Sequence, residues 1–482
     1  MEKIKPRPTV WQWIKMVVAV CLYVAFLVWV GSWWGVIVIP FIFDAYITKW
    51  IPWTWWKDSD NMLTRTVMSW VDAIVFALVA VYFVNIYFFQ NYTIPSSSLE
   101  KSLLVGDYLF VSKMSYGPRV PQTPLSMPLT QHTLPVIGCK SYSEWPQWEY
   151  RRVKGGKVQL NDIVVFNYPS GDTVAANPLY QNQDFYGLAY NIGYGLYGIN
   201  NGTLPLLSAM SPQQQRDFFG YIYSLGRTWI DANAEEYGGV MWRPVDRREN
   251  YVKRCVGLPG QTLQIKDRII YLDGKPNKEP DNVQYNYIVE LRRNIPEDLV
   301  RELGISGEDL QSLYSTGSMP LTNRAYERLK ACPDIVESIV YDTRDFGSEY
   351  LYPLNMYKDW TCDNYGPLWI PAKGESIRLT MDNIAIYERP IRVYEGNDLE
   401  VKDGQIFING EQSDSYTFRM DYYWMEGDNR HNSADSRYWG FVPEDHIVGK
   451  PILVWLSVDK DRSWFDGWIR WNRLFRWVDN IK

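Results

Sequence analysis

The sequence predicts N-terminal transmembrane helices followed by a mainly β extracytoplasmic domain with α/β insertions. Two observations support this fold class. Residues 1–90 of the 482-residue chain contain two long apolar runs, whereas the remainder consists of short runs of β-forming residues separated by Gly, Pro and Asp. The net charge changes sign at the same place. Residues 1–90 carry a net charge of +2, and the rest of the chain carries −8, which gives the total of −6.

Composition excludes several classes of protein. Hydrophobic residues make up 46% and charged residues 22%, which rules out disorder, collagen and coiled coil. The five cysteines show no C-x-x-C spacing, which argues against a disulfide framework and against a zinc site. We therefore expect no metal. Whether Cys332 and Cys362 form a disulfide is left open. An acidic body with a basic, apolar N-terminus does not indicate a nucleic-acid binder.

Residues 1–90 are predicted to form a membrane anchor of two or three spans. The last span is 67–89, whose 23 residues extend about 34 Å as a helix, enough to cross a bilayer. Upstream, 16–30 and 35–48 form either two short spans turning at 31–35 or one tilted span with an outside N-terminus. A cleaved signal peptide is disfavoured, because Trp33 and Trp34 occupy the place of its small-residue cleavage site.

Basic residues set the orientation of the anchor. They precede both apolar runs, and the positive-inside rule therefore places both basic stretches in the cytoplasm. Everything after Gln90 is then extracytoplasmic. The basic residues are Lys3, Lys5, Arg7 and Lys15 before the first run, and Lys49, Lys57 and Arg65 before the last span.

The body after Gln90 shows β patterning. Short β-like runs occupy 107–113, 162–168 and 262–272. LQIKDRIIYLDGK (263–275) aligns without gaps with LEVKDGQIFINGE (399–411), and both segments predict a β-hairpin because Asp-Gly or Asn-Gly follows the second strand.

Two insertions interrupt this pattern. The two hairpins bracket 276–398, which we predict to be an inserted α/β subdomain with helices near 297 and over 323–331. Residues 170–250 are a second insertion, in which Ser211-Pro212-Gln213-Gln214 forms a capping box ahead of a helix.

Residues 462–482 predict an amphipathic aromatic-basic helix. A stripe of large apolar residues recurs at spacings of 4, 3, 4 and 3, with arginines mostly off the stripe. Such a helix lies either on anionic membrane lipid or on the protein's own core. The stripe consists of Trp464, Trp468, Trp471, Phe475 and Val478, and the arginines are Arg470, Arg473 and Arg476.

Three segments concentrate reactive residues: YTIPSSSL (92–99), YVKRCVGLPG (251–260) and GDNRHNSADSRYWG (427–440). A serine hydroxyl is a weak nucleophile until a base takes its proton. The first two segments contain no histidine, so Lys253 is the candidate base, provided that burial lowers its pKa from about 10.4. A Ser-His-Asp arrangement with His431 and Asp435 is the alternative, although nothing fixes His431 near Ser98.

These segments resemble the conserved boxes of bacterial type I signal peptidases, which are membrane-anchored Ser/Lys endopeptidases. The longest match is GDNRHNSADSRYWGFVP (427–443), and KRCVGLPG (253–260) and DIVVF (162–166) resemble two further boxes. The resemblance covers about a quarter of the chain and implies catalytic roles for four residues. Ser98 would be the nucleophile, Lys253 the general base, Ser96 an oxyanion-hole donor, and Ser433 a hydrogen-bond partner that orients the lysine.

The resemblance also assigns supporting residues. It implies an apolar wall that keeps Lys253 neutral (Phe166, Tyr251, Met425 and Ala434), a structural ion pair (Asp435 and Arg437), and shallow pockets for small substrate side chains at the −1 and −3 positions (Ile94, Pro95, Leu99 and Val252). The chain departs from the family pattern at five places, which are Ser97, Leu99, Lys101-Ser102, Glu426 and His431. We expect Glu426 to face away from Lys253.

By this resemblance the catalytic β-domain comprises 91–169 with the nucleophile, 251–275 with the general base and 399–461 with the GDNR box. The expected activity is removal of N-terminal signal peptides from exported preproteins after small-x-small motifs, through an acyl-enzyme. The expected place is the outer face of the bacterial cytoplasmic membrane, with membrane lipid as a partner and with no cofactor. The alternatives are a Ser/Lys protease of different specificity and a catalytically silent membrane scaffold, and the oligomeric state stays open.

Overall fold

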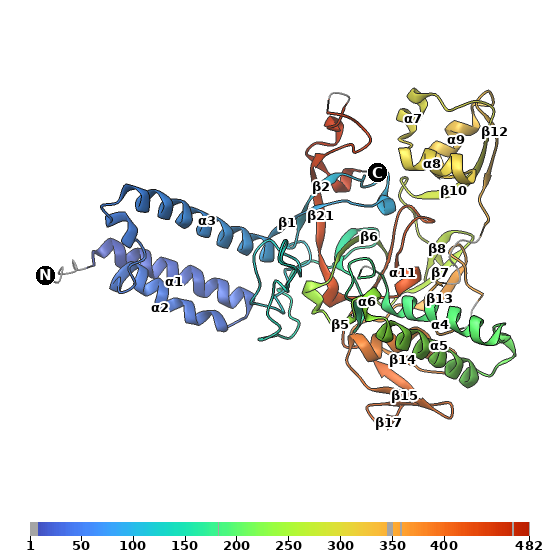
Figure 1. The fold of residues 1–482 in the computed structure, drawn as a ribbon, viewed down its shortest axis with the longest axis horizontal. Coiled ribbons are helices and arrows are strands. Elements are labelled where there is room, and N and C mark those ends of the chain that lie inside the picture. The colour runs from blue at the N-terminus through green and yellow to red at the C-terminus, as the bar shows by residue number, and fades with distance from the viewer. Residues whose placement is uncertain (1–7, 182, 345–349, 357–358, 465–466, 482) are drawn as a thin grey trace.

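The computed structural model describes residues 8–181, 183–344, 350–356, 359–464 and 467–481. Helices near the N-terminus project as a bundle from a larger β-rich body, as Figure 1 shows. Two of them, α1 (Val10–Val30) and α3 (Met62–Tyr87), are long and apolar enough to cross a membrane. The basic residues Lys3, Lys5 and Arg7, on which part of the predicted orientation depends, lie outside the described residues.

The segment between the two long helices folds back along α1. Residues 34–48 comprise a 3-10 turn, α2 (Ile39–Phe43) and a π turn. The Tyr23 hydroxyl donates to the Gly35 carbonyl at 2.9 Å, and the Trp13 and Phe43 rings lie 6.1 Å apart. The turn falls where the two-short-span prediction put it, but the returning segment has only 15 residues, fewer than the roughly 20 that a helical span needs.

The body is built on one antiparallel sheet of eight strands in the order β1-β2-β21-β3-β6-β19-β20, with β22 paired to β21. The predicted strands at 107–113 and 162–168 are confirmed. The strands are β1 (Phe89–Thr93), β2 (Asp107–Ser112), β3 (Ile163–Asn167), β6 (Asn250–Gly257), β19 (Tyr422–Glu426), β20 (Val442–Pro443), β21 (Ile447–Ser457) and β22 (Arg476–Trp477).

Alternation along β3 gives this sheet two apolar faces. Ile163 and Val165 pack into one core cluster, which also contains Leu99, whereas Val164 and Phe166 pack into a second cluster on the opposite face. Successive side chains of a strand point to opposite faces, so a buried run such as IVVF contributes to both. The central part of the sheet, which includes β6, therefore lies between two apolar core clusters.

Both predicted hairpins are present. Each is a two-stranded hairpin followed by a short third strand, and left-handed residues form both turns: Asp267-Arg268 and Asp273-Gly274 in the first, Asp403-Gly404 and Asn409-Gly410 in the second. The two hairpins share one hydrophobic core. Their strands are β7 (Thr262–Lys266), β8 (Ile269–Leu272) and β9 (Lys275–Pro276), and β15 (Leu399–Lys402), β16 (Gln405–Ile408) and β17 (Glu411–Gln412).

Residues 170–250 contain an antiparallel helical hairpin, α4 (Phe185–Asn201) and α5 (Pro212–Ala232), followed by α6 (Ala234–Tyr237). The predicted capping box before α5 is confirmed, because Ser211 and Gln214 cap each other's backbone. A two-stranded sheet of β4 (Val174–Ala175) and β5 (Val240–Met241) lies at the base of this hairpin.

Residues 276–398 consist of two structurally different parts. The first part has its own core and contains β10 (Gln284–Leu291), α7 (Glu297–Leu303), α8 (Gly307–Thr316), β11 (Ser318–Thr322), α9 (Asn323–Lys330) and β12 (Val336–Tyr341). The second part packs into the hairpin core and contains β13 (Tyr365–Trp369), β14 (Ser376–Arg378) and α10 (Ile384–Arg389). β13 pairs with β7, and β14 pairs with β18 (Ser415–Thr417).

The predicted C-terminal helix over 462–482 is wrong. In the described part of this segment the chain forms 3-10 turns at Trp471–Arg473 and Val478–Asn480 and the short strand β22. Arg473 is buried and binds the Asp107 carboxylate at 2.5 Å, and Val478 is 3% exposed within the core. These long-range contacts hold the segment against the sheet, and the predicted apolar stripe of a helix is not formed in its described part.

Candidate active site

Ser98 lies in a tight turn directly after β1. Ser97–Leu99 form a single 3-10 turn, and the Ser98 side chain is 7% exposed. The loop after β19 supports this turn, because the Asn429 N–H donates to the Ser98 carbonyl at 3.1 Å. A Cβ atom at Gly427 would lie 2.6 Å from the same carbonyl oxygen, so only glycine allows the loop to approach this closely.

Lys253 reaches the turn from β6. Its Nζ atom is 2.6 Å from Ser98 Oγ, although the two residues are 155 positions apart, and the side chain is 4% exposed. Burial lowers the pKa of Lys253 to about 8, against the opposing effect of the Asp435 and Asp428 carboxylates. A substantial fraction of this amine is therefore neutral near pH 8 and able to accept a proton from the Ser98 hydroxyl.

Strand alternation directs Arg254 away from Lys253. Arg254 forms a buried ion pair with Asp428, with Nη2 2.6 Å from Oδ2, and Asp428 also accepts a 2.5 Å hydrogen bond from Ser102. The guanidinium lies on the opposite side of β6 and is neutralised there. The sequence does not indicate this partner, which lies 174 residues further along the chain.

Three of the four residues expected to form the apolar wall are buried or half-buried. Phe166 and Met425 are fully buried in one cluster, and the Tyr251 ring centroid lies 5.9 Å from Lys253 Nζ. Ala434 differs from the prediction, because it is exposed and closes no buried wall. The Lys253 side chain is itself 4% exposed, and this burial is the main cause of its lowered pKa.

The predicted bond from Ser433 to Lys253 is not formed. Ser433 is 7% exposed, and within the described part of the chain its hydroxyl has no hydrogen-bond partner. It nevertheless lies at the site, because its Oγ atom would be 2.2 Å from a Cβ at Gly427. The same Cβ would lie 2.6 Å from the Ser98 carbonyl oxygen, so Gly427 lies against both Ser433 and the Ser98 turn.

Asp435 and Arg437 form a buried ion pair, with Arg437 Nη2 2.8 Å from Asp435 Oδ2. Glu426 is fully buried and lies 3.2 Å from Arg430, in agreement with the expectation that it does not face Lys253. Each of these two carboxylates thus pairs with an arginine, and burial of Lys253 outweighs the opposing effect of Asp435 on its pKa.

The predicted substrate-binding residues differ in accessibility. Ile94 and Leu99 are 2% and 1% exposed in one core cluster, and Val252 packs against that cluster while half-buried. Pro95 and Ser96 are exposed at the mouth of the site. Among the described residues the Ser96 side chain has no hydrogen-bond partner, so its hydroxyl is free to donate to a bound group.

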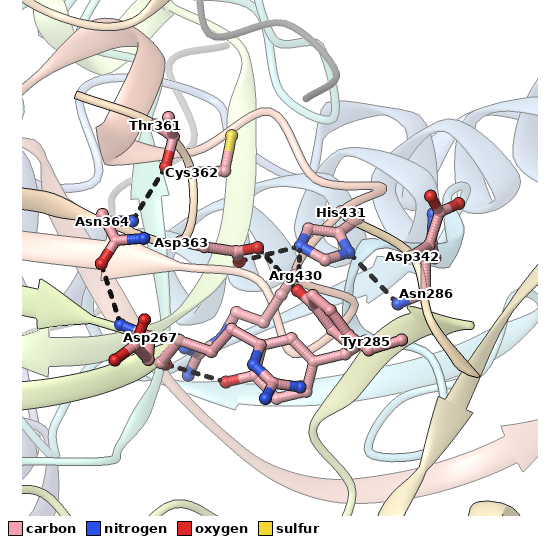
Figure 2. A network of polar contacts seen from close by, with 12 residues as sticks. Asp267, Tyr285, Asn286, Asp342, Thr361, Cys362, Asp363, Asn364, Arg430 and His431 are labelled. Carbon is pink, nitrogen blue, oxygen red and sulfur yellow. Dashed lines mark hydrogen bonds and ion pairs between the residues drawn. The ribbon is translucent and has the colours of Figure 1, made fainter. Parts of the chain in front are cut away.

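His431 belongs to a separate network, which Figure 2 shows. Its Nε2 atom is 3.0 Å from Asp363 Oδ1 and 3.1 Å from the Tyr341 hydroxyl, and its Nδ1 atom accepts from the Asn286 N–H at 3.1 Å. In the described chain neither ring nitrogen contacts Ser98. The alternative triad with His431 as the base therefore has no support in this geometry.

Two further residues of the site were not singled out from sequence. The Asn429 backbone holds the Ser98 carbonyl, and Asn432 Nδ2 donates to Ser97 Oγ at 3.3 Å. Their position within segment 427–440 is the only sequence signal for them. Together they link the loop after β19 to the serine-bearing turn.

Three features define the class of this protein: two long apolar helices, an antiparallel β-sheet domain after them, and a buried Ser–Lys hydrogen bond in that domain. Residues 67–303 and 372–456 match the family described as signal peptidase, peptidase S26. These residues are more than half of the chain and include Ser98, Lys253 and Ser433. The chain belongs to this family.

Individual relatives match over shorter stretches. Signal peptidase I of Buchnera aphidicola subsp. Acyrthosiphon pisum is 26% identical over 252 residues, which cover 49% of this chain and 58% of that protein. Signal peptidase I of Buchnera aphidicola subsp. Baizongia pistaciae is 24% identical over 49% of this chain and 59% of that protein. A probable signal peptidase I-2 of Synechocystis sp. is 35% identical over 198 residues, 38% of this chain and 80% of that protein. The chain thus spans less than two thirds of either Buchnera relative.

Proposed function

We propose that this chain is a membrane-anchored serine endopeptidase that removes N-terminal signal peptides from exported preproteins. The observation that carries the proposal is the 2.6 Å hydrogen bond between Lys253 Nζ and Ser98 Oγ in a buried site. Family membership supports the substrate class. The two long apolar helices support a membrane anchor, and we place the catalytic domain at the outer face of the bacterial cytoplasmic membrane.

In the proposed mechanism the preprotein docks as an extended strand beside the Ser98 turn, where backbone hydrogen bonds supply affinity. Neutral Lys253 takes the Ser98 proton as the hydroxyl attacks the carbonyl after the −1 residue. The Ser98 N–H and the Ser96 hydroxyl stabilise the oxyanion. Protonated Lys253 then donates to the leaving amine, and water hydrolyses the acyl-enzyme with the lysine again as base.

The membrane anchor raises the effective concentration of enzyme and substrate, because both are confined to one surface. Substrate selection depends on the −1 and −3 side chains. Ile94 and Leu99 are almost fully buried and offer little surface to a substrate side chain, so we expect the pockets beside them to be shallow and to accept only small groups. This supports cleavage after small-x-small motifs.

A preprotein with Ala at −1 and −3 tests this function. Replacing the −1 Ala by Leu should lower kcat/KM by at least about 100-fold, because the larger side chain does not fit the shallow pocket. The same replacement at −2, whose side chain points away from the enzyme in an extended strand, is the matched control and should be tolerated. Cleavage is followed by mass spectrometry of the mature N-terminus. Efficient cutting at another site would indicate a different Ser/Lys protease, and no cutting of any preprotein would indicate a scaffold.

A further inference from the structure

A cavity of about 530 Å³ lies where the last helix of the anchor meets the body. The final turns of α3 (residues 81–86) and the start of β1 form one side of it. The other side comes from the connecting segment, which we define as residues 113–162 between β2 and β3, together with Arg247. None of the lining residues belongs to the Ser98–Lys253 site, and the volume is in the range of small-ligand sites.

The cavity lining is rich in positive charge. Lys113, Arg119 and Arg247 line it, with Asp246 as the one carboxylate among the described lining residues. In the described chain none of the three cations forms an ion pair within 4 Å. One Asp246 oxygen accepts two 3.0 Å hydrogen bonds from Thr123, and the other is buried without a hydrogen-bond partner among the described residues, so the lining sets one carboxylate against three basic groups.

The three basic side chains bind no carboxylate in the described part of the chain. Arg119 donates to the Asn167 side chain and a backbone carbonyl, and Arg247 donates to Thr123, so both bind neutral partners. The Lys113 ammonium is half-buried and has no hydrogen-bond partner among the described residues. Burial beside Arg119 and Arg247 lowers the pKa of Lys113 to about 7. The lining thus places three partly buried basic groups against one carboxylate, and an anion in the cavity would balance this excess of positive charge.

The connecting segment lies beside the ends of the anchor helices (Figure 1). Tyr82 of α3 hydrogen-bonds Ser126 at 2.7 Å, and Arg151 donates to the carbonyl of Val30 at the end of α1. More than half of the surface of several large apolar residues is exposed on this segment: Leu125, Met127, Leu129, Val136, Ile137 and Trp145. Exposed apolar side chains next to apolar helices are typical of a segment that contacts lipid.

We propose that the cavity binds the phosphate headgroup of an anionic phospholipid, with Lys113, Arg119 and Arg247 around the phosphate. The acyl chains would extend along α3, beside Val81 and Met127, both of which line the cavity. A basic pocket at the end of a membrane helix is the geometry that recognises such headgroups. The bound lipid would fix the body relative to the membrane surface.

The test uses the full chain in detergent, titrated by calorimetry with dihexanoyl phosphatidylglycerol below its micelle concentration. One lipid should bind, and Lys113→Gln should weaken binding about tenfold, because one charge-assisted contact to the phosphate is lost. Lys113→Arg should retain binding. Lys154→Gln, which removes an exposed lysine from the same segment, is the matched control and should bind like the unmodified chain.

Two further ligands distinguish the sources of the phosphate. Inorganic phosphate and dihexanoyl phosphatidylcholine should each bind at least about tenfold more weakly than phosphatidylglycerol. Equal binding of inorganic phosphate would overturn the lipid assignment, and equal binding of phosphatidylcholine would overturn the anionic preference. Unchanged affinity in Lys113→Gln, with an unchanged melting temperature, would overturn the site itself. The assay involves no cleavage, so its outcome is independent of the proposed protease function.

Discussion

Ser98→Ala and Lys253→Met should each lower kcat/KM for preprotein cleavage by at least about 10⁴-fold. The first change removes the hydroxyl that forms the acyl-enzyme. The second removes the base that accepts its proton at 2.6 Å and replaces it with an apolar side chain suited to the buried site. Because the two groups act as a unit, the double variant should be no slower than either single variant.

The neighbouring serine supplies the control for this prediction. Ser97→Ala removes a hydroxyl that accepts only a 3.3 Å hydrogen bond from Asn432 and that makes no described contact with Lys253. It should retain activity within about tenfold of the unmodified chain. Cleavage that survives Ser98→Ala but disappears in Ser97→Ala would reassign the nucleophile.

Arg437→Ala should destabilise the body by about 3–5 kcal/mol, measured by denaturant unfolding followed by tryptophan fluorescence. Arg437 is 1% exposed and neutralises Asp435, which is completely buried, so its loss leaves a carboxylate with no counterion. It also donates at 2.6 Å to the Arg430 carbonyl, which holds the loop after β19.

A double variant separates the charge effect from lost packing. Asp435→Asn with Arg437→Met removes both charges and keeps most of the buried volume, so it should be less destabilised than Arg437→Ala alone. If the single and double variants were equally destabilised, the ion pair would not be the cause. Arg437 also lowers the pKa of Lys253, so the activity that remains in Arg437→Ala should require a higher pH.

Local sequence signals predicted local structure well. The two hairpins were found from their turns, because Asp273-Gly274 and Asn409-Gly410 favour left-handed backbone, which these turns require. The capping box at Ser211 likewise located the start of α5. Such signals act over a few residues and do not depend on the rest of the fold.

Long-range contacts were predicted less well. The periodic Trp and Phe spacing of 462–482 is typical of a helix, but Arg473 instead binds Asp107, which lies 366 residues away. No periodicity contains that information. The partner of Arg254 was missed for the same reason, since Asp428 lies 174 residues further along the chain.

The site itself was located from residue type and family resemblance together. Residue chemistry pointed to a buried lysine as the base for a serine, and the structure brings Lys253 and Ser98 together. Resemblance alone supplied the roles of Ser433 and Ala434, and these are the positions where the geometry departs from the expectation. Both lie in the loop after β19, whose path depends on contacts with Gln284 in the insertion and with the Ser98 carbonyl.

The rate of acylation by a serine-directed inhibitor, measured against pH with the adduct mapped by mass spectrometry, tests the central claim most directly. The claim predicts a single adduct on Ser98. It also predicts a rate that rises about tenfold between pH 7 and pH 9, because the pKa of Lys253 is about 8 and the neutral amine is the reactive form. An adduct on another residue, or a rate that follows a group near the ordinary histidine pKa and is lost in His431→Ala, would contradict it.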